Sequence, residues 1–155
     1  MHRLFAQECL NLDRTEILIS VQRRYFDSIA CGEKTVELRR RAPRVPAGSR
    51  IWLYCKSPVA TVAAVCKLQR IESLPIDEIW ERHGNALAIS KPEFEDYLLG
   101  REVATALVIQ DVQLLRKPLH LEAMRLLKIN FQPPQFFMHL RDDCALTNRL
   151  MLELA

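Results

Sequence analysis

The chain lacks several features that would identify a membrane, secreted or metal-binding protein. No apolar run approaches the roughly 18 to 20 residues that span a bilayer. The first residues include Glu8, Asn11 and Asp13, which interrupt the hydrophobic stretch of a secretory signal. Its five cysteines are odd in number and include no C-x-x-C pair, as is typical of buried thiols in a reducing compartment. These absences predict a cytoplasmic protein without a membrane partner.

Histidines are also few, and they show no spacing typical of metal ligands. The chain has four, and His2, His120 and His139 are far apart in the sequence. A zinc site normally needs several His, Cys or carboxylate side chains that converge on one point. The sequence therefore predicts no metal site, and no motif indicates a cofactor.

The composition describes one globular unit. The 155 residues are 49% hydrophobic and 26% charged, enough for one compact core and too few for two typical domains. We expect an N-terminal extension at 1–15, a domain at 16–140 and a helical tail at 141–155. The composition leaves the oligomeric state open.

Positive charge is concentrated in one part of the chain. Residues 23–50 contain eight Lys or Arg and three Asp or Glu, so this segment carries +5 and the remainder −2. Such a basic cluster indicates a polyanionic partner, although a solvated face would have the same composition.

Hydrophobic periodicity predicts several strands and short helices. Strands are expected at 17–21, 35–41, 51–55, 59–70, 103–115 and 135–140. Helices are expected at 24–31, 75–83, 92–99 and 120–127, with Gly32 ending the first and Ser90 capping the third. Several strands of mixed spacing are joined by short helices that gather between the fourth and fifth strands. This pattern predicts an α+β protein built on a small mixed β-barrel of five to six strands with short peripheral helices.

The segment Gly32-Glu-Lys-Thr-Val-Glu-Leu-Arg39 combines a turn with three charged side chains. Glu37 and Arg39 are two apart and should share one face of a strand, while Val36 and Leu38 face the core. Lys34 has the wrong parity for that face. It can join Glu37 only because it leaves a glycine turn, where the backbone need not be regular.

This segment resembles the G-x-K-x-x-E-x-R signature of the ASCH domain, a member of the PUA-like superfamily, in its bacterial and phage form. Later landmarks also resemble that family, including Tyr54-Cys-Lys-Ser-Pro and Pro133-Pro-Gln-Phe. The resemblance implies a small β-barrel with a cleft beside the signature that binds RNA or a nucleotide-like ligand. Some relatives are ribonucleases, and one branch hydrolyses the acetyl amide of acetylated cytidine.

The resemblance and the charge pattern lead to a set of candidate residues. The candidates for ligand or RNA binding are Arg23, Arg24, Lys34, Glu37, Arg39, Arg41, Lys56 and Ser57. The candidates for catalysis are Lys34, Glu37 and Tyr54.

Two classes of function follow from these residues. The first is a protein that binds RNA or a nucleotide through a basic cleft, in RNA metabolism or its regulation. The second is an enzyme that uses Lys34, either a metal-independent ribonuclease or a nucleoside amidohydrolase of the acetylated-cytidine type. The amidohydrolase branch uses Lys, Thr and Glu. Here Glu37 occupies the place of its Thr, and the segment 85–88 has no acid where that branch has its Glu.

Overall fold

The structure of the protein is a computed structural model that describes residues 15–141 and 144–154. The expected N-terminal extension at 1–15 therefore lies outside the described residues, except for Thr15. The expected helical tail is described from Cys144 to Leu154.

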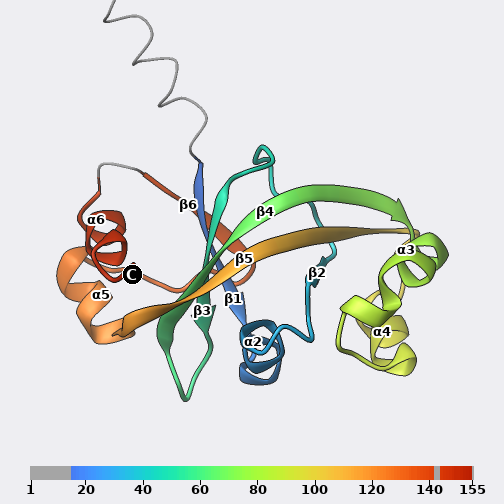
Figure 1. The fold of residues 1–155 in the computed structure, drawn as a ribbon, viewed down its shortest axis with the longest axis horizontal. Helices are drawn as coiled ribbons and strands as arrows, with labels where there is room; N and C mark the ends of the chain where they lie inside the picture. The colour runs from blue at the N-terminus through green and yellow to red at the C-terminus, as the bar shows by residue number, and fades with distance from the viewer. Residues whose placement is uncertain (1–14, 142–143, 155) are drawn as a thin grey trace, which may run out of the picture.

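Six strands form one mixed sheet in the described part of the chain (Figure 1). Their spatial order is β2-β5-β4-β3-β1-β6. Strands β1 and β3 pair in parallel, and the other neighbours pair antiparallel. The strands are β1 (Glu16–Val21), β2 (Val36–Arg39), β3 (Arg50–Cys55), β4 (Thr61–Pro75), β5 (Val103–His120) and β6 (Phe137–Leu140).

The helices lie around this sheet and are short. Helices α3 and α4 lie at one end of the long β4–β5 pair, and α5 and α6 lie at the other end (Figure 1). They are α2 (Arg23–Ala30), α3 (Ile76–His83), α4 (Lys91–Tyr97), α5 (Leu121–Leu127) and α6 (Ala145–Met151). No helix in residues 15–141 or 144–154 has the length and apolar character needed to cross a bilayer.

The core consists of three clusters, because both faces of the central strands are buried. Ile17 and Ile19 pack with α2 on one face of the sheet, whereas Leu18 packs with α5 and α6 on the other. A third cluster joins the outer face of β2 to α3 and α4 through Val36, Leu38 and their neighbours. This third cluster fixes β2 at the edge of the sheet, where the charged side chains of the signature lie.

The expected α+β class is confirmed, but the expected barrel is wrong. In the described residues the sheet is open: β2 and β6 form its two edges and do not pair with each other. The side chain of Arg39 spans this opening instead. Its Nη2 donates to the carbonyl of Ser20 at 3.0 Å, and its Nη1 donates to the carbonyl of Phe136 at 3.2 Å. The guanidinium group thus donates hydrogen bonds to backbone carbonyls at the place where a closed barrel would have strand-to-strand hydrogen bonds.

Candidate ligand-binding site

The turn after α2 places Lys34 beside the strand that follows it. Helix α2 ends at Ala30, and Gly32 then adopts a φ of +84°, in the left-handed region that favours glycine. The amide of Lys34 donates to the carbonyl of Ser28 at 3.0 Å, so Lys34 still belongs to the turn. Its side chain is therefore free of the strand alternation and reaches the face that carries Glu37.

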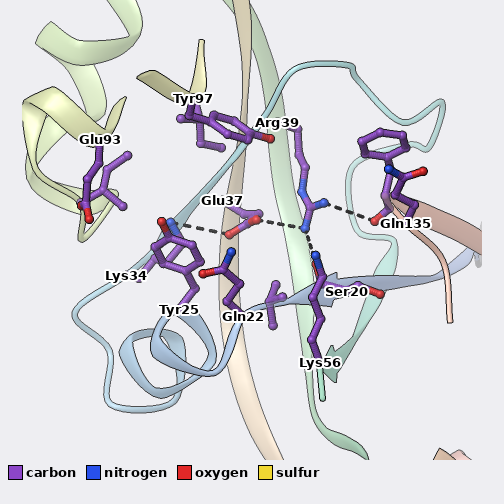
Figure 2. A pocket seen from close by; sticks show the side chains of 14 residues that line it. Ser20, Gln22, Tyr25, Lys34, Glu37, Arg39, Lys56, Glu93, Tyr97 and Gln135 are labelled. Atoms are coloured by element: carbon purple, nitrogen blue, oxygen red, sulfur yellow. Dashed lines mark hydrogen bonds and ion pairs between the residues drawn. The ribbon is translucent and has the colours of Figure 1, made fainter. Parts of the chain in front are cut away.

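Lys34, Glu37 and Arg39, which we call the charged triad, form a continuous chain of ion pairs (Figure 2). Lys34 Nζ lies 3.6 Å from Glu37 Oε2, and Arg39 Nη2 lies 3.0 Å from Glu37 Oε1. The side chains are 3%, 9% and 10% exposed, in the order Lys34, Glu37 and Arg39. Two cations and one anion are thus held together with little access to water.

Burial changes the acidity of the lysine in the triad. Loss of hydration disfavours the charged ammonium and lowers the pKa of Lys34 below its usual value, and the carboxylate of Glu37 only partly opposes this shift. The nearby guanidinium of Arg39 lowers this pKa further. The ammonium keeps one firm acceptor, the carbonyl of Leu87 at 2.7 Å. Lys34 is therefore easier to deprotonate than a surface lysine.

Two polar atoms of the triad have no hydrogen-bond partner among the described residues. They are Glu37 Oε2, an acceptor, and Arg39 Nε, a donor, and both are buried. A buried polar group left without a partner costs about 1–3 kcal/mol. The triad therefore keeps hydrogen-bonding capacity that the folded chain does not use.

The triad forms part of the wall of a cavity of about 230 Å³. The cavity lies between the end of β1, helix α2, strand β2, helix α4 and the segment before β6 (Figure 2). Its lining residues are Ser20, Val21, Gln22, Tyr25, Lys34, Glu37, Leu38, Arg39, Lys56, Ile89, Glu93, Tyr97, Gln135 and Phe136. Charged, amide, aromatic and aliphatic groups thus meet in one small space, as in sites for small polar ligands.

Two tyrosines contribute aromatic surface to this wall. The Tyr25 ring lies over the Lys34 ammonium, with 5.1 Å between Nζ and the ring centroid. Its hydroxyl accepts a hydrogen bond from Arg24, and Arg24 also binds the Glu93 carboxylate at 2.7 Å. Tyr97 extends from α4, and burial raises the pKa of its phenol. Tyr97 is therefore an uncharged donor near neutral pH.

The structure brings some of the predicted site residues together. Lys34, Glu37, Arg39 and Lys56 all line the cavity, and Arg24 is joined to it through Tyr25 and Glu93.

Other candidates lie outside the cavity wall. Arg23 pairs with Asp27 on the exposed side of α2, and Arg41 and Ser57 are exposed. Tyr54 belongs to the core cluster that faces α5 and α6. Its neighbour Leu53 points to the other face of the sheet, the face that packs against α2. That placement separates its hydroxyl from the triad, and burial raises its pKa.

Several lining residues are not among the candidates that the sequence indicates. Tyr25, Tyr97 and Glu93 come from two helices, and Ser20 and Gln22 from the end of β1. Polar residues just after a buried strand are a usable signal, since Gln22 follows the apolar run at 17–21. No local pattern distinguishes Tyr97 from a core aromatic, because its role depends on how α4 packs beside β2.

Candidate ligands of a metal ion in the described residues are the His, Cys, Asp and Glu side chains. Within 15–141 and 144–154, no group of three or more His, Cys, Asp or Glu side chains is placed to hold an ion.

Comparison with known proteins gives consistent matches. The ASCH domain family matches residues 19–113. A protein of Zymomonas mobilis named ASCH domain-containing ribonuclease is 37% identical over 131 residues, which cover 84% of this chain and 88% of that protein. The crystal structure of ASCH from Zymomonas mobilis has a TM-score of 0.85 at 35% identity and covers 92% of this chain and 98% of that one.

A more distant structure has the same general fold. Human THYN1, solved in complex with DNA that contains 5-methylcytosine, has a TM-score of 0.55 at 10% identity, and the match covers 90% of this chain and 97% of that one. The matched residues 19–113 include the whole signature and most of the cavity wall. On these grounds the chain belongs to the ASCH domain family.

Proposed function

We propose that this protein binds single-stranded RNA by accepting one nucleotide in the cavity beside the charged triad. The observation that carries the proposal is the presence of three buried charged side chains in the wall of a cavity that also offers two tyrosine rings. Proteins that read single-stranded RNA combine ring surfaces for bases with polar groups for base edges. The ribonuclease name of the Zymomonas relative supports RNA as the ligand.

The position of Lys56 supports a path for the RNA backbone. Its exposed side chain lies at the cavity wall directly after β3, on the side away from α4. An ammonium group in this position can neutralise a phosphate while the attached base enters the cavity.

A binding experiment tests this proposal. Fluorescence anisotropy with a labelled single-stranded RNA should give saturable binding to the wild type. Replacement of Lys34 and Arg39 by alanine together should weaken it at least tenfold, about 1.4 kcal/mol. Lys117→Ala, on the remote end of β5, is a matched control for the loss of a cation. Unchanged affinity in the double variant would contradict the proposal.

RNA cleavage at the same cavity is a second candidate function, favoured by the lowered pKa of Lys34. A neutral amine could accept the proton of a ribose 2′-hydroxyl as that oxygen attacks the adjacent phosphorus. The O2′–P bond would form, the P–O5′ bond would break, and the 5′ oxygen would leave as a hydroxyl with a proton from solvent. Products would carry a 2′,3′-cyclic phosphate.

Incubation of single-stranded RNA with the protein and EDTA tests the metal-independent form of this reaction. Cleavage that continues in EDTA and disappears in Lys34→Ala would support it. Cleavage retained in Lys34→Ala would remove Lys34 from the mechanism.

The amidohydrolase alternative has less support. Glu93 is a cavity carboxylate outside the triad, but it accepts hydrogen bonds from Arg24 and from the amide of Ser90. Those bonds favour the anion and lower the pKa of Glu93, which suits a fixed structural role better than proton transfer. Incubation with acetylated cytidine decides this point: release of acetate by the wild type and not by Lys34→Ala would restore the alternative.

A further inference from the structure

The charged triad presents an ordered set of hydrogen-bonding groups along the cavity wall. Lys34, Glu37 and Arg39 follow one another in this order (Figure 2). Lys34 Nζ has three hydrogens and gives one to the carbonyl of Leu87, while its 3.6 Å separation from Glu37 is too long for a normal hydrogen bond. The wall therefore offers a donor at Lys34, an acceptor at Glu37 Oε2 and a donor at Arg39 Nε.

The described residues leave the central acceptor and the Arg39 donor unused, and they use only one of the three hydrogens of Lys34 Nζ. Glu37 Oε2 and Arg39 Nε have no hydrogen-bond partner among the described residues, although both side chains are at least nine-tenths buried. A ligand that supplies these partners relieves a cost already present in the free protein, so the gain on binding is larger than for an exposed pair.

From this pattern we propose that the cavity selects uracil among the four RNA bases. The pairing edge of uracil presents O4, N3–H and O2, an acceptor, a donor and an acceptor. In the bound state N3–H donates to Glu37 Oε2, and the two carbonyl oxygens accept from Lys34 Nζ and Arg39 Nε. This inference rests on the proposed function, because it assigns the base that the RNA places in the cavity.

The other three bases each oppose at least one group of the triad. Cytosine and adenine present an unprotonated ring nitrogen to Glu37, so that two acceptors face each other. Guanine presents a donor to Glu37, but its exocyclic amine then faces one of the two cations. A mismatched buried donor or acceptor is expected to reduce affinity strongly, since neither partner can turn to water.

The size of the cavity agrees with a single pyrimidine ring. Its volume of about 230 Å³ is below the roughly 300–1,000 Å³ typical of small-molecule sites. Leu38 and Ile89 supply aliphatic surface in the wall, and Tyr25 and Tyr97 supply rings. The two unpartnered atoms are nearly closed to water, so side chains of the wall must move when the base enters. A displacement of Tyr25, whose ring lies over the Lys34 ammonium, would open the wall at its Lys34 end.

Four labelled RNA oligonucleotides test the proposal with the wild-type protein. Each is an adenosine tract with one central position, which is uridine, cytidine, adenosine or N3-methyluridine. Anisotropy should show at least tenfold tighter binding of the uridine oligonucleotide than of the others, with intact RNA verified by gel electrophoresis afterwards. N3-methyluridine is the decisive probe, because a methyl group replaces the central hydrogen-bond donor and both carbonyl oxygens stay in place.

The outcomes separate this inference from the proposed function. Equal affinity for uridine and N3-methyluridine would overturn the base assignment while RNA binding itself remained. Absence of binding to all four would remove the proposed function and the inference together.

A matched pair of variants tests the role of Glu37 directly. Glu37→Gln supplies an amide that can donate to the ring nitrogen of cytosine, so the preference for uridine over cytidine should fall at least tenfold. Glu33→Gln makes the same change on an exposed neighbour outside the cavity wall and should leave the preference unchanged. A uniform loss of affinity in Glu37→Gln with an unchanged preference would show a structural role only. If Glu37→Gln fails to fold in a thermal melt, the N3-methyluridine result decides alone.

Discussion

At the scale of single residues, Lys34 and Glu37 differ in what their removal leaves behind. The charged triad contains two cations and one anion, so loss of Lys34 leaves the balanced pair of Glu37 and Arg39. Loss of Glu37 leaves two buried cations without an anion. Breaking a buried pair by removing one partner typically costs about 3–5 kcal/mol, whereas replacing a buried ion by a well-packed apolar side chain is often neutral.

We therefore predict a small effect on stability for one methionine variant and a large loss for another. Lys34→Met should change the free energy of unfolding by less than about 2 kcal/mol, while Glu37→Met should lower it by about 3–5 kcal/mol. Urea denaturation monitored by tryptophan fluorescence measures both. RNA affinity should fall in Lys34→Met even though that variant remains folded. Similar losses of stability in the two variants would show that the triad does not behave as one electrostatic unit.

The lowered pKa of Lys34 predicts a dependence of stability on pH. At pH values between the pKa of Lys34 in the folded chain and the usual lysine pKa of 10.5, the unfolded chain binds more protons at Lys34 than the folded chain does. The contribution of Lys34 to the free energy of unfolding therefore rises with pH across that range. Below the folded-state pKa, the folded chain bears the full cost of burying the ammonium.

A comparison of variants isolates this contribution from other titrating groups. The free energy of unfolding of Lys34→Met minus that of the wild type should be most positive near pH 7. It should fall toward pH 10, because only the wild type gains stability as Lys34 loses its proton. Denaturation curves at several pH values measure it. A difference that stays constant across this range would mean that Lys34 keeps an ordinary pKa.

At the scale of elements, the position and type of most helices and strands could be predicted from hydrophobic periodicity. The expected strand at 17–21 corresponds to β1, and the expected helix at 24–31 to α2. Ser90 forms the predicted capping box with Glu93 at the start of α4. The predicted ends of β4 and β5 are too early, because beyond them most residues are polar or exposed and only Ile71, Leu74 and Leu119 contact the core. Periodicity finds buried surface, and these extensions have little.

The turn between α2 and β2 offers a prediction at this scale. Gly32 and Gly48 have φ values of +84° and +86°, and an added Cβ meets no atom within 4 Å at either position. Alanine should therefore cost about 1–2 kcal/mol of stability at both sites, through backbone conformation alone.

Gly32→Ala should also weaken RNA binding several-fold, because Lys34 belongs to the same turn. Gly48→Ala is the matched control, since Gly48 lies before β3 and outside the cavity wall. Thermal unfolding and anisotropy measure the two effects, and equal RNA affinity in both variants would contradict this role for the turn.

At the scale of the whole molecule, neither the open sheet nor the long-range ion pairs, such as Arg24 with Glu93 and Arg50 with Glu16, could be predicted from local patterns. Periodicity assigns each strand a buried face but does not say which edges meet, so it cannot predict the gap that Arg39 spans. The +5 segment shows the same limit. Among the described residues, five of its eight cations form ion pairs, namely Arg23, Arg24, Lys34, Arg39 and Arg50. The surface is consequently less basic than the sequence indicates.

This internal pairing predicts a shallow dependence of RNA affinity on salt. Each phosphate neutralised on a single strand contributes about −0.7 to the slope of log K against log salt, so eight free cations would give a slope of about −5 to −6. With most of them paired, two to four phosphate contacts should remain, and the slope should be about −1.4 to −2.8.

Lys56→Ala should make the slope shallower by about 0.7, whereas Lys128→Ala, on the far side beside α5, should leave the slope unchanged. Titrations at four salt concentrations measure these slopes. A wild-type slope near −5 would mean that the ion pairs open when RNA binds, and that the basic segment acts as a phosphate-binding surface instead of the wall of a base-reading cavity.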